Sequence, residues 1–202
     1  CLSRPNEKSI LYFIDENTGK EIGYFGGIGQ GPGEVIKVPT FTGMSPKKDT
    51  LYIHDFNARD MKIYYLNAKD STVSFKFAYS KKLANPLVDN LGTGYFTICR
   101  LKNGHYVGLS GLCHSDIFHV LDSDLNIVKR FGGFPLDGLT TDGSTTNMTL
   151  SFMGNLVNHG NSIYYAANKF GYIARYDITD DLEIKLVWEN FYSKTDYRER
   201  HP

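Results

Sequence analysis

The sequence predicts an all-β protein built from repeated four-stranded antiparallel sheets, and three observations lead to this fold class. The 202 residues include 14 Tyr, 13 Phe and 20 Gly, which combines strand-favouring aromatic residues with frequent turn residues. Short apolar strands with polar turns between them follow one another along the chain. One strand–turn–strand template also recurs at a nearly constant spacing.

The recurring template is an apolar strand, an Asp or Asn, a short polar turn and a second apolar strand. Its polar residue falls at Asp15, Asn67, Asp122 and Asp177, so the steps are 52, 55 and 55 residues. An Asp or Asn side chain accepts hydrogen bonds from nearby backbone amides, so each of these residues is expected to cap its turn. A period of this size is typical of solenoids and propellers.

Each full period also holds two earlier strands. They are expected at 38–44 and 50–55, at 95–101 and 105–112, and at 153–158 and 162–167. Asn103–Gly104 predicts a two-residue type I′ hairpin. Four antiparallel strands in about 50 residues predict a β-propeller blade. The expected blades are residues 1–25, 38–77, 94–132 and 153–188, with a polar tail at 189–202.

The blade count predicts an incomplete ring within a single domain, residues 1–202. Residues 1–3 and 10–15 align without a gap on residues 108–110 and 117–122, which places Cys1 inside a second strand. About 3.75 blades are then present, and open blade edges are a liability. The favoured interpretation is a part of a larger propeller. The alternatives are a four-bladed ring completed by the tail, and a ring completed by a second chain.

Two segments resemble a known family. Thr18–Ile22 followed by Gly29–Glu34 resembles a segment between blades of the TolB-like and NHL-like six-bladed propellers of Gram-negative gut bacteria, and His54–Tyr64 is similar to an NHL blade pattern. The resemblance implies an exported protein, periplasmic or on the cell surface, often a lipoprotein, with no established activity for most members. It also implies six blades, of which roughly a third would be absent here.

Charge and motifs exclude several function classes. Lys and Arg number 22, as do Asp and Glu, so no net charge attracts nucleic acid or an anionic membrane. No run approaches the roughly 18 apolar residues of a membrane helix. Neither a nucleophile motif nor a metal-ligand spacing occurs, so no catalytic residue, metal or cofactor is predicted. A metal site assembled from several blades stays open.

The glycine-rich segment Gly26–Gly33 invites comparison with a phosphate cradle. Such cradles need a helix N-terminus behind the glycines, whereas a β-branched stretch containing Pro39 follows here. We therefore expect a structural loop between blades, with glycines that supply positive φ. A polar turn with a local Asp–Arg pair is expected at 55–60. The residues assigned to these structural motifs are Gly29, Gly31, Pro32, Gly33, Asp55 and Asn57.

The three cysteines are expected to be unpaired. A turn at Asn103–Gly104 would place Cys99 opposite Gly108 and leave Cys113 about 16 Å further along the strand, which is too far for a disulfide. Cys1 has two interpretations, a strand residue or the lipid-bearing cysteine of a lipoprotein. The alignment described above favours the strand.

Two sets of loops are expected on one propeller face, and long loops on a rigid scaffold commonly carry function. They are residues 26–37, 78–92 and 132–151, and residues 56–60, 111–116 and 168–171. The polar side chains selected there as binding candidates are Gln30, Glu34, Arg59, Lys81, Lys82, His114, Asp137 and Asp142.

A clear repeat without a catalytic constellation favours a non-catalytic binding or scaffolding propeller. Its expected partner is a protein, a peptide or a glycan held on the loop-rich face. The alternative is a propeller enzyme, a lyase or hydrolase with a site on the axis. Converging His, Asp and Glu residues would favour the enzyme, and an aromatic outer patch would favour the binding protein.

Overall fold

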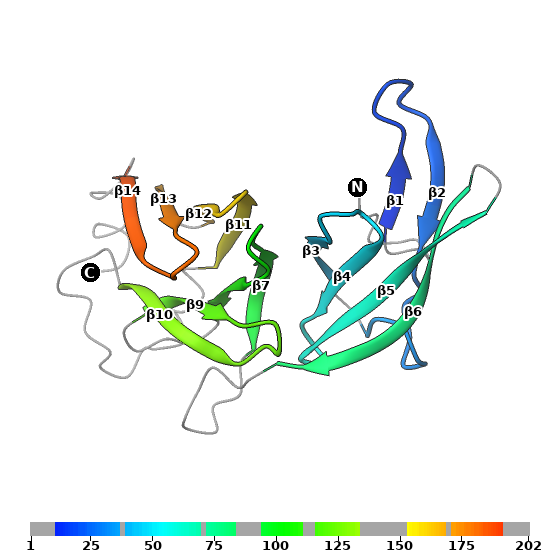
Figure 1. Ribbon diagram of the computed structural model, residues 1–202, viewed down its shortest axis with the longest axis horizontal. Coiled ribbons are helices and arrows are strands. Elements are labelled where there is room, and N and C mark those ends of the chain that lie inside the picture. Colours follow the sequence, from blue (N-terminus) through cyan, green and yellow to red (C-terminus); the bar gives the residue numbers. More distant parts are fainter. Residues whose placement is uncertain are drawn as a thin grey trace. The chain divides into compact units, whose positions relative to one another are not determined.

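The computed structural model describes residues 11–36, 39–69, 72–83, 94–110, 116–133, 153–168 and 171–191. Within these ranges the chain forms fourteen strands (Figure 1). They contain no helix that is long and apolar enough to cross a membrane. The chain divides into two compact units, Cys1–Leu83 and Ala84–Pro202, which are described separately.

The first unit holds a two-stranded hairpin and a four-stranded antiparallel sheet. Strand β2 of the hairpin lies against β6, the last strand of the sheet. A Cβ at Gly23 of β2 would collide with the Val73 carbonyl of β6, so this approach requires a glycine. The strands are β1 (Leu11–Ile14), β2 (Glu21–Phe25), β3 (Pro39–Met44), β4 (Thr50–Asp55), β5 (Asp60–Lys69) and β6 (Thr72–Lys82).

The second unit holds two four-stranded antiparallel sheets. Their first strands, β7 and β11, lie in contact. The first sheet consists of β7 (Tyr95–Arg100), β8 (Tyr106–Ser110), β9 (Asp116–Leu121) and β10 (Ile127–Gly133), and the second of β11 (Gly154–His159), β12 (Ser162–Ala167), β13 (Tyr172–Ile178) and β14 (Ile184–Phe191).

The three four-stranded sheets share one topology, in which hydrogen-bonded neighbours follow one another in chain order. Equivalent strands of successive sheets also lie in contact. In the second unit these are the first strands, β7 and β11, and in the first unit they are the last strands, β2 and β6. Such sheets are propeller blades. The predicted fold class, all-β with four-stranded antiparallel propeller blades, is confirmed.

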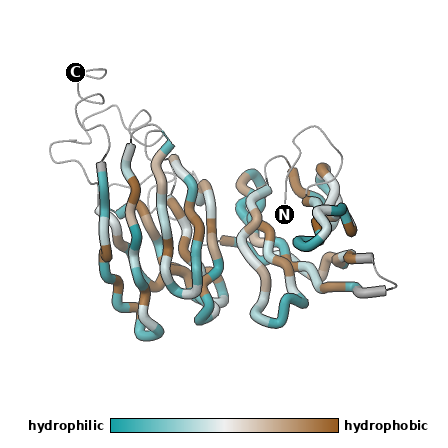
Figure 2. Tube along the Cα trace, turned by 90° about the horizontal axis from the view of Figure 1, so that it is seen from above, coloured by the Kyte–Doolittle hydropathy of each residue, from teal (hydrophilic) through white to brown (hydrophobic). Residues whose placement is uncertain are grey.

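Each unit has its own apolar core between sheets. In the first unit, Leu11 and Phe25 of the hairpin pack with Leu51, Ile53 and Tyr64 of the sheet. In the second, the core joins β7–β10 to β11–β14 and includes the Phe118 ring at 5.1 Å from Tyr165. Hydrophobic and hydrophilic stretches alternate along many strands (Figure 2), as expected for sheets with chemically different faces.

The predicted turn caps are correct at two of the four template positions. Asp15 accepts bonds from the amides of Asn17 and Thr18 at 3.0 and 2.8 Å, and Asp122 caps the β9–β10 turn in the same way. Asn67 and Asp177 instead lie inside β5 and β13. These two strands continue beyond the template, so the caps predicted there are wrong.

The hairpin at Asn103–Gly104 has a different register from the one predicted. Cys99 lies opposite Val107, and Ile98 lies opposite Gly108. Gly104 has a φ of 93°, whereas the φ of Asn103 is not positive. A type I′ turn needs positive φ at both central residues, whereas a three-residue loop needs it only at the last. The loop is therefore Lys102–Gly104.

Two strands extend beyond the ends that the sequence predicts. Strand β6 continues to Lys82, so the loop predicted from Ala78 is strand as far as that residue. Strand β14 continues to Phe191, into the predicted tail. Cys99 is buried and free. Cys1 and Cys113 lie outside the described residues, as do residues 134–152.

Candidate functional site

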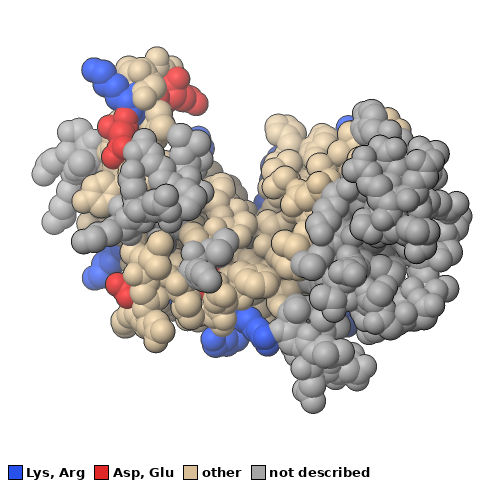
Figure 3. Space-filling view, turned by 180° about the vertical axis from the view of Figure 1, so that it is seen from behind, with Lys and Arg blue, Asp and Glu red and all other residues tan. Residues whose placement is uncertain are grey.

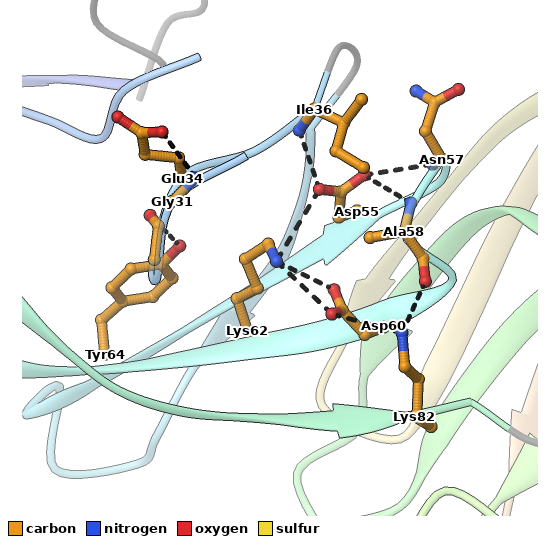
Figure 4. Close-up of polar contacts among 11 residues, drawn as sticks. Gly31, Glu34, Ile36, Asp55, Asn57, Ala58, Asp60, Lys62, Tyr64 and Lys82 are labelled. Atoms are coloured by element: carbon orange, nitrogen blue, oxygen red, sulfur yellow. Dashed lines mark hydrogen bonds and ion pairs between the residues drawn. The ribbon is translucent and has the colours of Figure 1, made fainter. Parts of the chain in front are cut away.

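Asp55, at the end of β4, ties a turn and a loop to the first unit's sheet (Figure 4). Its side chain is fully buried. Oδ1 accepts bonds from the amides of Asn57 and Ala58 at 3.1 and 3.0 Å, and Oδ2 accepts one from Ile36 at 2.9 Å. A buried carboxylate is stable only when such donors replace water. One side chain therefore fixes both the β4–β5 turn and the end of the glycine-rich loop.

Two lysines neutralise the carboxylates at this end of the sheet. Lys62 of β5 is 8% exposed, and its Nζ lies 3.3 Å from Asp60 Oδ1 and 3.9 Å from Asp55 Oδ2. Lys82 Nζ lies 3.9 Å from Asp60 Oδ2 and donates to the Ala58 carbonyl at 3.0 Å. The charges of the buried cluster are thus matched, as buried ions require.

The glycine-rich loop folds around the Glu34 carboxylate. Glu34 Oε2 accepts a bond from the Gly31 amide at 2.8 Å, and a Cβ at Gly29 would collide with the same carboxylate. Gly33 has a φ of 77°, and a Cβ there would lie 2.6 Å from Phe77 Cβ. The loop therefore encloses its own carboxylate where a phosphate cradle would leave space for a ligand.

Tyr64 of β5 holds the glycine-rich loop against the sheet by a hydrogen bond. Its hydroxyl donates to the Gly33 carbonyl at 3.0 Å. Burial raises the pKa of this hydroxyl, and the charges of Asp60 and Asp55 raise it further. Tyr64 therefore keeps its proton and serves as a hydrogen-bond donor. Tyr64 and Asp55 together hold the C-terminal part of the loop, at Gly33 and at Ile36.

The predicted binding residues fall into three groups. Gln30 and Arg59 are exposed and Glu34 is half-buried, and all three lie outside the strands. Lys81 and Lys82 lie on β6 rather than in a loop, with the Lys82 side chain 77% exposed. Leu83 N donates to the Arg59 carbonyl at 3.2 Å, so the end of β6 and the β4–β5 turn are adjacent. The other candidates, His114, Asp137 and Asp142, lie outside the described residues.

Lys62 was missed in the sequence, although a signal was present. It occupies the template position that Ile117 and Tyr172 fill in the later repeats. A charged residue at an otherwise apolar strand position indicates a buried partner of opposite charge. The neighbouring Asp55 and Asp60 were singled out as a turn cluster, but their ion pairs with Lys62 depend on the β4–β5 pairing.

A second buried polar group lies in the second unit. The Tyr95 hydroxyl is 3.0 Å from His119 Nδ1, and both side chains are buried. Burial lowers the pKa of His119 to about 4, and the charge of Arg130 acts in the same direction. The imidazole is therefore neutral at pH 7 and packed inside the sheet structure, where it has no surface to offer a ligand.

The described residues contain no group of three or more His, Cys, Asp or Glu side chains arranged to hold a metal ion. Charged side chains of both signs gather at one hairpin end in Figure 3, and a second group, of Lys and Arg alone, lies at the lower centre of that view. Exposed donors occur on the β4–β5 turn, at Asn57 and Arg59, at the end of β6, at Lys82, and in the glycine-rich loop, at Gln30. Their chemistry suits recognition of polar groups by hydrogen bonding.

Comparisons with known proteins find similarity in structure alone. No protein-family model and no curated protein matches the sequence. Solved structures that match include a protein from Lactobacillus plantarum, with a TM-score of 0.49 and 11% identity. A candidate 6-phosphogluconolactonase from Bacteroides uniformis gives a TM-score of 0.47 and 15% identity, and a candidate exported protein from Bacteroides fragilis gives 0.45 and 17%.

These matches cover 92%, 90% and 87% of this chain but only 50%, 50% and 64% of the matched chains. The chain therefore spans about half to two thirds of their length. At such low identity and TM-score the matches say nothing about activity, and the fold class rests on the three four-stranded sheets described above. The class of protein is a β-propeller.

Proposed function

We propose that this chain is part of an exported, non-catalytic propeller that binds a protein, peptide or glycan partner on its loop-rich face. The observation that carries the proposal is the triple anchoring of the β4–β5 turn and the glycine-rich loop by Asp55. A surface whose backbone is fixed before binding loses less conformational entropy when it holds a ligand.

The proposed surface consists of exposed side chains on the two segments that Asp55 anchors and at the end of β6. Gln30 belongs to the loop, Asn57 and Arg59 belong to the turn, and Lys82 ends β6. Asp55, Asp60 and Lys62 are buried, and Lys82 completes the charge balance of this support. The support holds the turn and the loop in place while Gln30, Asn57 and Arg59 face the solvent, which is the pattern of a binding site on a rigid scaffold.

The proposal also covers the longer protein of which this chain would be a part. A six-bladed ring of the TolB-like or NHL-like kind, with a periplasmic or cell-surface location and a lipid anchor, follows from the resemblance of Thr18–Ile22 and Gly29–Glu34 to that family. The spacing of the repeats is compatible with it. A longer chain would supply the remaining blades.

The test is a binding screen of the biotinylated chain against peptide and glycan arrays, followed by titration of any ligand found. Lys82→Ala and Gln30→Ala are expected to weaken binding by about tenfold, as removal of a central contact does. Lys47→Ala is the matched control, since Lys47 is exposed in the β3–β4 turn at the opposite end of the same sheet. Equal binding by all variants, or a ligand that is consumed during the titration, would contradict the proposal.

A further inference from the structure

Charges of opposite sign are treated differently at the end of the first unit's sheet that Asp55 anchors. The acids Asp55 and Asp60 are buried, with 0% and 5% exposure. Among the described residues of the β4–β5 turn and of the end of β6, the charged side chains that are exposed are Arg59 and Lys82. This end of the sheet therefore presents positive charge to a ligand, while its negative charge lies in the interior.

Lys82 carries an ammonium whose position is fixed and whose donors are partly unused. Its Nζ donates to the Ala58 carbonyl at 3.0 Å, while Asp60 Oδ2 lies 3.9 Å away, beyond hydrogen-bond distance. An ammonium has three donors, so donors remain for a ligand. The Lys82 side chain is 77% exposed, so a carboxylate from outside can reach them.

Asn57 offers an amide beside this ammonium. The backbone amides of Asn57 and Ala58 both donate to Asp55 Oδ1, and the Ala58 carbonyl holds Lys82. The Asn57 side chain is exposed and points away from the Asp55 carboxylate (Figure 4). It makes no hydrogen bond with the described part of the chain. A side-chain amide of this kind can donate to and accept from one peptide group at the same time.

Ile36 supplies an apolar contact on the other side of the same carboxylate. Its backbone amide donates to Asp55 Oδ2 at 2.9 Å, and Figure 4 shows Ile36 and Asn57 on either side of Asp55. Ile36 is 41% exposed. An apolar group, an amide and an ammonium therefore follow one another along this surface, at Ile36, Asn57 and Lys82.

We infer that the partner held at this end of the sheet is an acidic peptide segment. The inference rests on the function proposed above and names the ligand of that surface. An aspartate or glutamate of the peptide pairs with Lys82, a peptide group bonds the Asn57 side chain, and a neighbouring aliphatic side chain packs on Ile36. Exposed charge of one sign attracts and orients a ligand of the other sign, and acidic motifs are commonly recognised by basic clusters.

Two features distinguish this occupant from others. Propeller blades pack face to face, whereas Asn57 lies in a turn and Lys82 is the last residue of its strand, so this surface is not a blade junction. A peptide also alternates amide groups with side chains, which matches an amide beside an exposed Ile36. A glycan presents hydroxyl groups and has no aliphatic side chain to place there.

The experiment is fluorescence polarisation of the full chain with short labelled peptide pools. The acidic pool alternates Asp or Glu with Leu, Val or Ile, and two comparison pools replace the acids by Asn and Gln or by Lys and Arg. Labelled oligogalacturonate is the acidic glycan. Saturable binding of the acidic pool alone is expected. A rise in sodium chloride from about 0.05 to about 0.3 M is expected to weaken it several-fold, because salt screens exposed charges.

Charge reversals at two positions of one strand locate the site. Lys82→Glu and Lys76→Glu change the net charge equally, and both lysines are exposed on β6. Lys82→Glu is expected to weaken binding of the acidic pool by about tenfold or more. Lys76→Glu is expected to change it by less than about twofold, since Lys76 lies about 20 Å away along the strand, beyond the screening length of about 10 Å.

Three further variants test the contacts one at a time. Lys82→Gln removes the charge without reversing it, and Asn57→Ala and Ile36→Ala remove side chains but keep the backbone amides that Asp55 binds. Each is expected to weaken binding by about three- to tenfold. Circular dichroism of every variant confirms that its sheets are intact.

Several outcomes would overturn the inference. They are the absence of binding by the acidic pool, equal binding by the neutral pool, binding of oligogalacturonate without the acidic pool, and equal losses in Lys82→Glu and Lys76→Glu. A neutral, basic or glycan ligand whose binding is weakened by Gln30→Ala and Lys82→Ala would overturn the acidic peptide and leave the proposed function intact. Absence of binding by every probe, on the arrays as well as in solution, would contradict both.

Discussion

Two carboxylates, Asp55 and Asp177, show how differently one repeated sheet can use the same chemical group. Asp55 is fully buried and accepts bonds from three backbone amides of a turn and a loop. Asp177 has a side chain that is 43% exposed and accepts bonds from the side chains of Ser162 and Arg175. The first carboxylate supports the fold, whereas the second organises a surface.

Burial and the type of donor distinguish the two clusters. Asp55 is buried and bonded to backbone amides, whereas Asp177 is exposed and bonded to side chains. A buried charge is costly to leave without partners, so the residues around Asp55 cannot rearrange to meet a ligand. An exposed ion pair contributes little to stability, so the residues around Asp177 can change at little cost to the fold.

The largest effect is expected from Asp55→Ala. The substitution removes three hydrogen bonds and one partner of the buried Lys62, and breaking a buried pair in this way costs about 3–5 kcal/mol. Urea unfolding followed by circular dichroism measures the change in the free energy of unfolding. A loss below about 1 kcal/mol would place Asp55 with the exposed pairs and remove the distinction.

The next effect is a loss of stability in acid through His54. This imidazole is fully buried in the first unit, and burial lowers its pKa from 6.5 to about 4. The unfolded chain therefore binds a proton that the folded chain excludes between pH 6.5 and 4. Stability present above pH 6.5 falls by about 2–3 kcal/mol over this window, at 1.36 kcal/mol for each unit of pKa difference.

The His54→Leu variant tests this prediction by comparison of unfolding free energies at pH 7 and pH 4.5. The variant is expected to lose less stability over this interval than the natural chain. His159→Leu, which alters an exposed side chain of β11, serves as the matched substitution. Identical pH dependence of the natural chain and His54→Leu would show that this histidine is not held neutral by burial.

A smaller effect is expected from Gly33→Ala. The φ of 77° is unfavourable for alanine, and the new Cβ would lie 2.6 Å from Phe77 Cβ, so the loop must shift at a cost of about 1–3 kcal/mol. Gly160→Ala is the informative comparison, because its φ is also positive but no atom lies within 4 Å of its Cβ position. Equal losses for both variants would mean that backbone strain alone is responsible.

The smallest effect on stability is expected from Arg175→Ala. Its ion pair with Asp177 is partly exposed, and such pairs contribute about 0–1 kcal/mol. The same urea unfolding experiment measures it. A loss comparable with that of Asp55→Ala would show that Asp177 also supports the fold, and the contrast between the two carboxylates would disappear.

Much of the fold was predictable because it depends on local patterns. The repeat of the template located the sheets, and the strands predicted at 50–55 and 162–167 are β4 and β12. Leu51 and Ile53 alternate along β4 and are both fully buried, and His159 pairs with Ser162 across the short turn at Gly160–Asn161. Spacing and turn chemistry are properties of short segments, so the sequence carries them directly.

The rest depends on contacts between segments. The burial of His54 on the second face of β4 and the pairing of Lys62 with Asp60 are set by tertiary packing. Asn103–Gly104 predicts a two-residue type I′ turn, whereas the structure has a three-residue loop, Lys102–Gly104. Both kinds of hairpin loop accommodate Asn-Gly, so the dipeptide alone does not distinguish them. The sequence also does not show that Arg175 lies opposite Tyr164 and Trp188, because these residues come together only through the register of three strands.

The most direct test of the supporting role of Asp55 is native-state hydrogen exchange at the Ile36 amide. This amide belongs to the glycine-rich loop and donates to Asp55 Oδ2 at 2.9 Å. Strong protection in the natural chain, lost in Asp55→Ala together with that of Asn57 and Ala58, is the expected result. Exchange of Ile36 as fast as that of an exposed amide in the natural chain would show that Asp55 does not hold the loop.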